Sequence, residues 1–358
     1  MIPQIEPWID ECELKELEKV IKSTFITEGE ATEEFESLIK EYTGSKYVVA
    51  MCNGTMALYA ILESLDIGEG DEVIVPDMTF VATANAVILA GAKPVFCDID
   101  PLTKCIDVNE VSKLINNRTQ AIMPVHLYGL SADLDPLLEI CQKHHLFLIE
   151  DAAQSMGVKY KDRHTGTFGI GGILSFYGNK TITSAEGGAV LTNHEQIAKS
   201  CYRLKNHGRD RKGIFKHEMI GFNFSYTDLQ AAIGIAQLRK LNKIIKRKKE
   251  IRECYKKELG NIEKITFQEI PGYIKPVFWF TNIYFEDAEG FSTYLKNHNI
   301  GTRRFFYPLH IQPCYAYLSA NKCEESLRTY NTGVSLPSSY TLTDSDLKYI
   351  CETIKNYF

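Results

Sequence analysis

Residues 171–193, GGILSFYGNKTITSAEGGAVLTN, decide the fold because they hold two strand-like runs joined by a short link. The first run covers residues 171–180 and the second covers residues 187–193, and only a few residues around Glu186 connect them. A connection this short favours antiparallel pairing, because parallel strands need a long crossover. This stretch therefore predicts an antiparallel strand pair within whatever sheet the preceding residues form.

The chain before this stretch alternates short apolar runs with helical patterns. Near-continuous apolar runs of strand length are typical of parallel strands buried on both faces. They occur at residues 47–51, 71–76, 93–99, 120–128 and 146–151. Helical patterns lie between or beside them at residues 55–64, 82–89, 108–115 and 135–144. Because strand and helix repeat in turn, we predict an α/β fold with a large mixed sheet.

A longer helical pattern at residues 227–259 carries the basic run KIIKRKKEIR (243–252). We interpret this run as the solvated face of a helix rather than as a nucleic-acid patch. After it, glycines punctuate a second α+β segment that continues to Phe358. We therefore expect residues 1–245 to form an N-terminal arm and a large α/β domain, and residues 246–358 to form a small C-terminal α+β domain.

Composition excludes several classes of protein. A chain of 358 residues is long enough for two domains. Its 40 lysines and arginines oppose 46 aspartates and glutamates, a formal net charge of −6, which gives no electrostatic reason to bind a polyanion. No apolar run of about 18 residues indicates a transmembrane helix, and the N-terminus is acidic where a signal peptide is basic. We expect a cytoplasmic protein without nucleic-acid or membrane partners.

The ten cysteines are scattered along the chain, and no two stand at C-x-x-C spacing. Zinc sites and redox pairs are recognised in sequences by such spacing. We therefore expect mostly buried, reduced thiols, and neither a metal site nor a disulfide framework.

Two residues at predicted strand ends carry candidate chemistry. Lys180 follows a buried strand in a Gly-rich, nearly uncharged neighbourhood, and a desolvated lysine has a lowered pKa and serves as an amine nucleophile, for example in a Schiff base. Asp151 ends the run LFLIED (146–151), and ligands of open α/β sheets bind at the carboxyl ends of strands. The alternatives are a lysine that only extends to solvent at the sheet edge and an aspartate that only caps a helix.

Further residues complete the set that pyridoxal phosphate requires. This cofactor needs a lysine, a carboxylate against its pyridinium nitrogen, a phosphate cup and an aromatic ring over the pyridine. The helix start after Gly54, together with Ser175, supplies a phosphate cup, and Phe80 supplies a ring. With Lys180 and Asp151, one candidate stands in each role, so the sequence predicts a pyridoxal phosphate site.

Ten motifs extend this likeness over nearly the whole chain, from Ile2 to Phe358. They are NGT (53–55), PDMTFVAT (76–83), PVHLYG (124–129), EDAAQ (150–154), GTFG (166–169), SFYGNK (175–180), EGGA (186–189), KNHGRD (205–210), GFNFSYTDLQAAIGIAQL (221–238) and RRFFYPLH (303–310). In order and spacing they resemble the DegT/DnrJ/EryC1/StrS family of sugar aminotransferases. The resemblance implies a fold-type I, aspartate aminotransferase-like fold.

The resemblance also assigns roles to individual residues. Lys180 looks like the catalytic lysine, Asp151 like the partner of the ring nitrogen, and Gln154 lies near the phenolic oxygen of the cofactor. The remaining cofactor contacts implied by the motifs are Gly54, Thr55 and Ser175 to the phosphate, Phe80 as the stacking ring, and Asn223 to the phosphate from the neighbouring subunit. Asn223 has an alternative role as a turn or capping residue. The substrate contacts implied are Arg303, Tyr307 and His310, each of which has a structural alternative.

The family's chemistry implies that L-glutamate donates an amino group through the cofactor, which passes through the pyridoxamine phosphate form, to a keto carbon of a nucleotide-linked sugar. The motifs SFYGNKTITSAEGG (175–188) and RRFFYPLH, with the terminal KNYF, resemble the branch that acts on GDP-4-keto-6-deoxymannose for surface polysaccharides. The resemblance implies a homodimer whose active sites lie at the subunit interface. The sequence leaves open whether two such dimers join into a dimer of dimers.

Three residues depart from the family pattern, and several alternatives stay open. Ser225 stands where relatives usually have arginine, Ala185 replaces a glycine, and Arg304 replaces a frequent proline. Open alternatives are a UDP- or dTDP-linked 4-keto or 3-keto sugar as substrate, a pyridoxamine-dependent sugar dehydratase, and a non-catalytic regulator. Lys180 argues against the dehydratase, where histidine takes the lysine position. A dinucleotide-binding dehydrogenase lacks support because no G-x-G-x-x-G follows the first strand.

Overall fold

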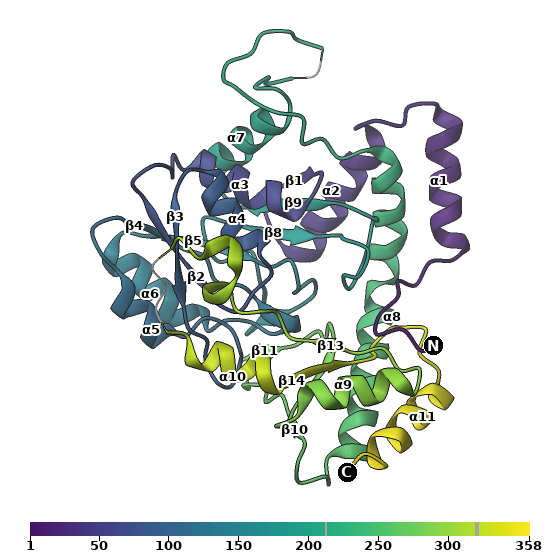
Figure 1. Ribbon diagram of the computed structural model, residues 1–358. Coiled ribbons are helices and arrows are strands. Elements are labelled where there is room, and N and C mark those ends of the chain that lie inside the picture. The colour runs from purple at the N-terminus through teal and green to yellow at the C-terminus, as the bar shows by residue number, and fades with distance from the viewer. Residues whose placement is uncertain (212, 319–321) are drawn as a thin grey trace.

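A mixed sheet lies at the centre of the computed structural model, which describes residues 1–211, 213–318 and 322–358 (Figure 1). Among these residues the sheet has seven strands in the order β1-β9-β8-β5-β4-β2-β3. Their bounds are β1 (Tyr47–Met51), β2 (Glu72–Pro76), β3 (Lys93–Cys97), β4 (Thr119–Ile122), β5 (Phe147–Asp151), β8 (Gly171–Ser175) and β9 (Gly188–Thr192).

Strand directions confirm the mixed sheet predicted from residues 171–193. The strands from β3 to β8 pair in parallel, whereas β9 runs antiparallel to both β8 and β1. The strand expected at residues 120–128 is shorter than predicted, because β4 ends at Ile122. Pro124 has no N–H to continue the ladder, and the chain passes into a 3-10 turn at Leu127–Gly129.

Helices cover both faces of this sheet, as the alternating pattern predicted. They are α3 (Gly54–Ser64), α4 (Ala82–Leu89), α5 (Val108–Leu114), α6 (Leu134–His144) and α7 (Glu195–Lys205). α3, α4 and α7 share one buried core, to which they contribute Leu58, Val87 and Cys201. α5 and α6 share another, to which they contribute Val111 and Leu137. The sheet is therefore buried on both sides, which accounts for its unbroken apolar strands.

The long helix α8 (Asp228–Leu259) confirms the helical pattern at residues 227–259 and holds the N-terminal arm. The helices α1 (Glu11–Ser23) and α2 (Glu30–Thr43) of this arm pack along α8 (Figure 1). At the start of α8, the carboxylate of Asp228 accepts hydrogen bonds from the backbone N–H groups of Gly29, at 2.7 Å, and Thr32, at 3.0 Å. One side chain thereby satisfies free donors at the beginning of α2.

A second core surrounds the C-terminal half of α8, where Ile251, Tyr255 and Leu259 are buried. Its sheet has the order β10-β12-β14-β13 and is covered by helices. The bounds are β10 (Thr266–Phe267), β12 (Thr281–Tyr284), β13 (Arg303–Arg304), β14 (Gly333–Leu336), α9 (Ala288–Asn297), α10 (Glu324–Thr332) and α11 (Asp344–Lys355). α8 runs unbroken through residue 245, so the boundary that we expect there lies inside one helix.

A small third sheet links the two parts of the chain. It has the order β11-β6-β7, with β6 (Lys159–Tyr160), β7 (Arg163–His164) and β11 (Ile274–Lys275). After β11, the segment 277–280 enters the large part, where Trp279 and Phe280 join the core beside α5 and α6. The C-terminal region thus reaches the end of the main sheet at which β5 and β8 finish.

The sequence also predicts the state of the cysteines and the character of the helices. The ten cysteines, all within the described residues, form no disulfide bonds, and six of them are buried. Of the helices in the described ranges, none combines the length and the apolar character needed to cross a bilayer.

Candidate active site

A cavity of about 570 Å³ lies where β5 and β8 end and α3 begins. Phe80 and Thr83 line it from the loop after β2 and from α4, while Trp279 and Phe306 line it from the C-terminal region. The structure brings eight of the eleven predicted site residues to this cavity. They are Gly54, Thr55, Phe80, Asp151, Gln154, Ser175, Lys180 and Arg303.

Lys180 occupies the turn after β8, where its N–H donates to the carbonyl of Tyr177 at 2.9 Å. Its Nζ lies over the ring of Trp279, 4.3 Å from the ring centroid, and the Trp279 Nε1–H donates to the Asn179 carbonyl at 2.6 Å. Burial lowers the pKa of Lys180 to about 8, the charge of Asp151 opposes this shift, and the guanidinium of Arg303 adds to it. A substantial fraction of this amine is therefore neutral near pH 8, as a nucleophile requires.

Asp151 is the buried carboxylate of the cavity. Its Oδ2 accepts a 2.8 Å hydrogen bond from the Thr83 hydroxyl, and its Oδ1 accepts a 3.1 Å bond from the Ala153 N–H. Both donors are neutral, so they hold the carboxylate in place without cancelling its charge. Asp151 can therefore present a fixed negative charge to a cationic group in the cavity.

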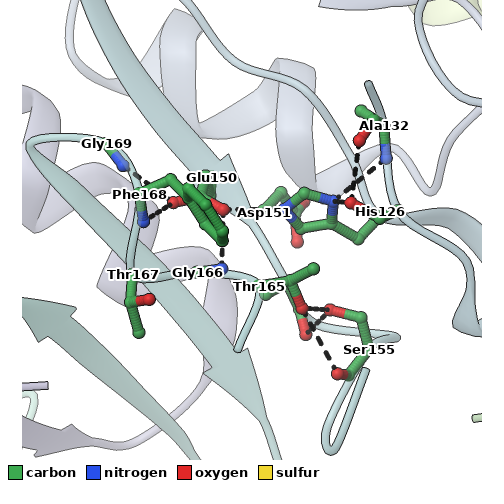
Figure 2. A network of polar contacts seen from close by, with 12 residues as sticks. His126, Ala132, Glu150, Asp151, Ser155, Thr165, Gly166, Thr167, Phe168 and Gly169 are labelled. Atoms are coloured by element: carbon green, nitrogen blue, oxygen red, sulfur yellow. Dashed lines mark hydrogen bonds and ion pairs between the residues drawn. The ribbon is translucent and has the colours of Figure 1, made fainter. Parts of the chain in front are cut away.

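Behind Asp151 the adjacent Glu150, which is fully buried, is the centre of a polar network (Figure 2). The amide of Ala132 donates to His126 Nδ1, so His126 Nε2 carries the proton that it donates to Glu150 at 3.0 Å. Backbone N–H groups of Gly166, Phe168 and Gly169 also donate to the Glu150 carboxylate.

Burial alone would raise the pKa of Glu150, but the hydrogen bonds from His126 and from the 166–169 loop hold it below its usual range. Successive side chains of a strand point to opposite faces. An ionised, fully bonded Glu150 therefore fixes β5 from behind and aims Asp151 at the cavity.

The start of α3 forms a candidate phosphate cup. Asn53 caps this helix by accepting the Met56 N–H at 2.9 Å, which leaves the first N–H groups of Gly54 and Thr55 at the cavity. The positive end of a helix dipole at such a position favours anions. A Cβ added at Gly54 would lie 3.4 Å from Ser175 Cβ, so the hydroxyl of Ser175 stands against the same helix start.

An aromatic group joins the other side of the cavity to the C-terminal region. The ring of Phe80 lies 6.1 Å from that of Phe306, which in turn stacks on Tyr128 at 5.4 Å. The Tyr128 N–H donates to Gln154 Oε1 at 3.1 Å, and the Phe306 N–H donates to the Tyr128 hydroxyl oxygen at 3.2 Å. Tyr128 therefore connects Gln154 in the sheet region with the substrate-side segment at 303–310.

Three predicted site residues lie outside the residues that line the cavity. Tyr307 is exposed and packs edge-on against Tyr330. His310 is paired with Asp77, whose carboxylate bonds both its ring and its backbone N–H. Asn223 is exposed and makes a backbone bridge with Asn206, in the segment between α7 and α8 that extends from the body in Figure 1.

Two of the departures from the family pattern now have a structural description. Ala185 adopts φ +71°, a left-handed conformation that costs a residue with a Cβ on the order of 1 kcal/mol and that glycine adopts freely. Arg304 donates to the Tyr330 carbonyl at 2.6 Å and stacks over its ring, away from the cavity. Arg304, which stands where relatives frequently have proline, therefore adds no charge to the cavity.

The donor set of the cavity fits pyridoxal phosphate. It offers a neutral-prone lysine, an ionised carboxylate, a helix start with a hydroxyl for a phosphate, and an exposed aromatic ring. Sequence reasoning missed Thr83 and Trp279. Thr83 ends the quoted motif PDMTFVAT, and its place one helical turn after Phe80 was an available signal. Trp279 left no such signal, because no strand end or glycine-rich turn marks residues 277–280.

Comparison with known proteins places the whole chain in context. Residues 7–355 match the model of the DegT/DnrJ/EryC1/StrS aminotransferase family. A protein of Vibrio cholerae named GDP-perosamine synthase is 39% identical, with 100% of this chain and 99% of the relative aligned. A protein of Escherichia coli O157:H7 with the same name is 36% identical, with 100% and 98% aligned.

Solved structures agree with the fold. A DegT/DnrJ/EryC1/StrS aminotransferase from Brucella abortus superposes with a TM-score of 0.92 at 30% identity, covering 97% of this chain and 95% of its own. The Spr1654 protein of Streptococcus pneumoniae, solved in a PLP form, superposes with a TM-score of 0.94 at 26% identity, covering 99% and 98%. These likenesses confirm the predicted fold-type I class and the predicted cofactor.

Lys180 reactivity provides a direct test of the site. Cofactor-free protein mixed with pyridoxal phosphate and then reduced with borohydride should carry its label on Lys180. The labelling rate should rise with pH through a midpoint near pH 8, because the amine reacts only after it loses its proton. Peptide mapping by mass spectrometry locates the label, and rates across a pH series give the midpoint.

The matched control is Lys180→Arg, which should take up no borohydride-stable label. A label on another lysine would refute the site assignment. A midpoint near the ordinary lysine value of 10.5 would refute the desolvation of Lys180.

Proposed function

The chain belongs to the DegT/DnrJ/EryC1/StrS aminotransferase family and is a pyridoxal phosphate-dependent sugar aminotransferase, and from this premise we propose that it converts GDP-4-keto-6-deoxymannose to GDP-perosamine. L-Glutamate is the proposed amino donor, and the product serves the synthesis of surface polysaccharides. The observation that carries the proposal is a half-buried lysine and a buried carboxylate in one cavity with an arginine that pairs with no carboxylate among the described residues. The sugar is chosen because relatives named GDP-perosamine synthase are 36–39% identical over nearly their whole length.

Residues of this chain would hold the cofactor at both ends. The helix start at Gly54 and Thr55, together with Ser175, would take the phosphate, while Asp151 would face the ring nitrogen and Gln154 the phenolic oxygen. Phe80 would cover one face of the ring. When bound, pyridoxal phosphate supplies an electron sink that stabilises negative charge on the substrate carbon next to nitrogen.

Lys180 and Asp151 have separate proposed roles, proton transfer for Lys180 and stabilisation of a charged ring nitrogen for Asp151. Lys180 Nζ, whose pKa is lowered by burial to about 8, takes a proton from a carbon atom and returns it to another during amino transfer. Asp151 keeps its negative charge in a fixed position because the Thr83 hydroxyl and the Ala153 N–H both donate to it. A fixed negative charge there keeps a ring nitrogen protonated through the reaction.

Arg303 is the proposed contact for the diphosphate of the sugar nucleotide. It lies in the exposed part of β13, lines the cavity, and forms no ion pair with any carboxylate among the described residues. A guanidinium without a carboxylate partner is suited to bind a diphosphate with two parallel hydrogen bonds. Tyr307 and His310 follow on the same segment but lie outside the cavity lining, so we propose no direct substrate contact for them.

We further propose that the enzyme is a homodimer with shared sites. The segment between α7 and α8 carries Phe215 and Ile220, which are 83% and 85% exposed, and Phe80 and Tyr177 at the cavity are also exposed. Large apolar side chains left exposed on a monomer are typical of an interface between subunits. Asn223, on the same segment, would then reach the cofactor phosphate of the partner site.

A cytoplasmic location is part of the proposal. The substrates are a nucleotide sugar and an amino acid, and the relatives with this name are biosynthetic enzymes. The composition gives no reason to expect a nucleic-acid partner, since acidic residues outnumber basic ones.

The proposed activity is tested by offering the purified enzyme L-glutamate with separate GDP-, UDP- and dTDP-linked 4-keto and 3-keto sugars. Mass spectrometry should detect the amino sugar most rapidly from GDP-4-keto-6-deoxymannose. Faster turnover of a UDP- or dTDP-linked sugar would refute the proposed substrate and leave the aminotransferase chemistry standing.

Arg303→Lys should raise the KM for the sugar nucleotide by roughly tenfold, because a point charge replaces a two-bond contact and a loss of about 1.4 kcal/mol is tenfold in affinity. The glutamate half-reaction, followed by the change in cofactor absorbance, should stay nearly the same. Arg304→Lys is the matched control, since Arg304 is bonded to a backbone carbonyl outside the cavity. Equal loss in both half-reactions, or no change in either, would show that Arg303 only supports the fold.

Shared sites are tested with two inactive variants. Lys180→Ala lacks the catalytic amine, and Asn223→Ala should lose most activity while it stays folded. Purified heterodimers should recover up to about half of the wild-type activity, because each holds one intact site of two, and an unseparated co-expression mixture about a quarter, because about half of its dimers are mixed. No recovery in verified heterodimers would place Asn223 in its own chain's site.

A further inference from the structure

Three potential metal ligands from distant segments meet beside the cavity but outside its lining. Asp77 follows β2, His310 lies in the short 3-10 turn Leu309–Ile311, and Cys323 immediately precedes α10. Their ligand atoms all lie within 4.8 Å of one another. We propose that this cluster binds a divalent cation of the zinc class and thereby joins the loop after β2 to the 303–310 segment and to α10.

The geometry of the cluster is close to that of a metal site. His310 Nδ1 lies 2.7 Å from Asp77 Oδ2. Zinc bonds of roughly 2.0–2.3 Å place tetrahedral ligand atoms about 3.3–3.6 Å apart. The ligand atoms of the three side chains lie within 4.8 Å of one another, so a side-chain movement on the order of an ångström would bring them to this separation. Oxygen, nitrogen and sulfur ligands together favour zinc over magnesium or calcium, which prefer oxygen alone.

The surroundings orient these ligands. The backbone N–H of His310 donates to Asp77 Oδ1 at 2.7 Å, and that of Leu309 donates to the Asp77 carbonyl at 2.8 Å. These bonds fix one carboxylate oxygen and leave Oδ2 directed at the imidazole. Metal-binding carboxylates are usually held by such outer hydrogen bonds. Asp77 and Cys323 are also almost completely buried.

The charge at the cluster favours a cation. Within the described ranges no lysine or arginine forms an ion pair with Asp77 or Asp98. A divalent ion would neutralise this negative charge and displace the thiol proton.

The site would act on the enzyme through its neighbours. Asp77 stands two residues before Thr79, and Thr79 and Phe80 line the cavity. His310 ends the segment that supplies Arg303 and Phe306 to the same cavity. A bound ion would link these two walls and, because it binds the folded chain, would raise the thermal midpoint.

The test uses the full-length, cofactor-loaded enzyme with Zn²⁺ as the probe. After equilibration and removal of free metal, elemental analysis should find one Zn²⁺ per chain, and the thermal midpoint should rise with Zn²⁺ concentration. Cd²⁺ in place of Zn²⁺ should produce the ultraviolet charge-transfer absorbance of a cadmium–thiolate bond. Cys323→Ala should abolish that absorbance and lower Zn²⁺ affinity by about tenfold or more.

The matched control is Cys314→Ser, an exposed cysteine close in sequence to the cluster, which should bind both ions like the wild type. Absorbance of the bound cofactor and the metal-free thermal midpoint show whether each variant is folded. If Cys323→Ala is unfolded, His310→Gln takes its place and should show the same tenfold loss. The proposal is overturned if the wild type retains no Zn²⁺, if no thiolate band develops, or if a folded Cys323→Ala or His310→Gln variant binds Zn²⁺ as tightly as the wild type.

Discussion

The desolvation of one amine governs the organisation of this protein. Lys180 is half-buried with its Nζ over the face of Trp279, and this desolvation lowers its pKa to about 8 while the charge of Asp151 limits the shift. Without burial the lysine would be protonated and unreactive. Without Asp151 the cavity would lose its fixed negative charge. The opposed effects of burial and charge leave an amine that can both attack and exchange a proton near neutral pH.

The fold holds Asp151 and the start of α3 in place through contacts outside the cavity. The fully bonded Glu150 anchors β5 through His126 and the 166–169 loop, and so holds the strand that presents Asp151. The antiparallel strand β9 brings Gly188 so close to the start of α3 that a Cβ there would lie 2.5 Å from the carbonyl carbon of Asn53. This close packing keeps the helix start, and its free N–H groups, beside the turn that carries Lys180.

The C-terminal region completes the site from the opposite side. Trp279 covers the lysine, Phe306 extends the aromatic wall from Phe80, and Arg303 adds a cation that pairs with no carboxylate in the part of the chain that the structure describes. Tyr128 bonds to both sides of the cavity, and the proposed metal cluster of Asp77, His310 and Cys323 lies at the same junction. The proposed substrate contact at Arg303 and the proposed metal cluster therefore both lie where the two regions meet, whereas Lys180 and Asp151 follow strands of the main sheet.

The sequence by itself determined the α/β class, the antiparallel pair at residues 171–193, the long helix α8, and Lys180 and Asp151 as neighbours in one cavity. These follow from local patterns, because apolar periodicity, glycines and strand ends are written in consecutive residues. Only the tertiary structure decided that Trp279 covers Lys180, that Asp228 caps α2, and that His310 turns to Asp77 instead of the cavity. Each of these contacts joins residues about 100 to 230 positions apart. Such contacts depend on how the two regions pack against each other, and no local pattern specifies that packing.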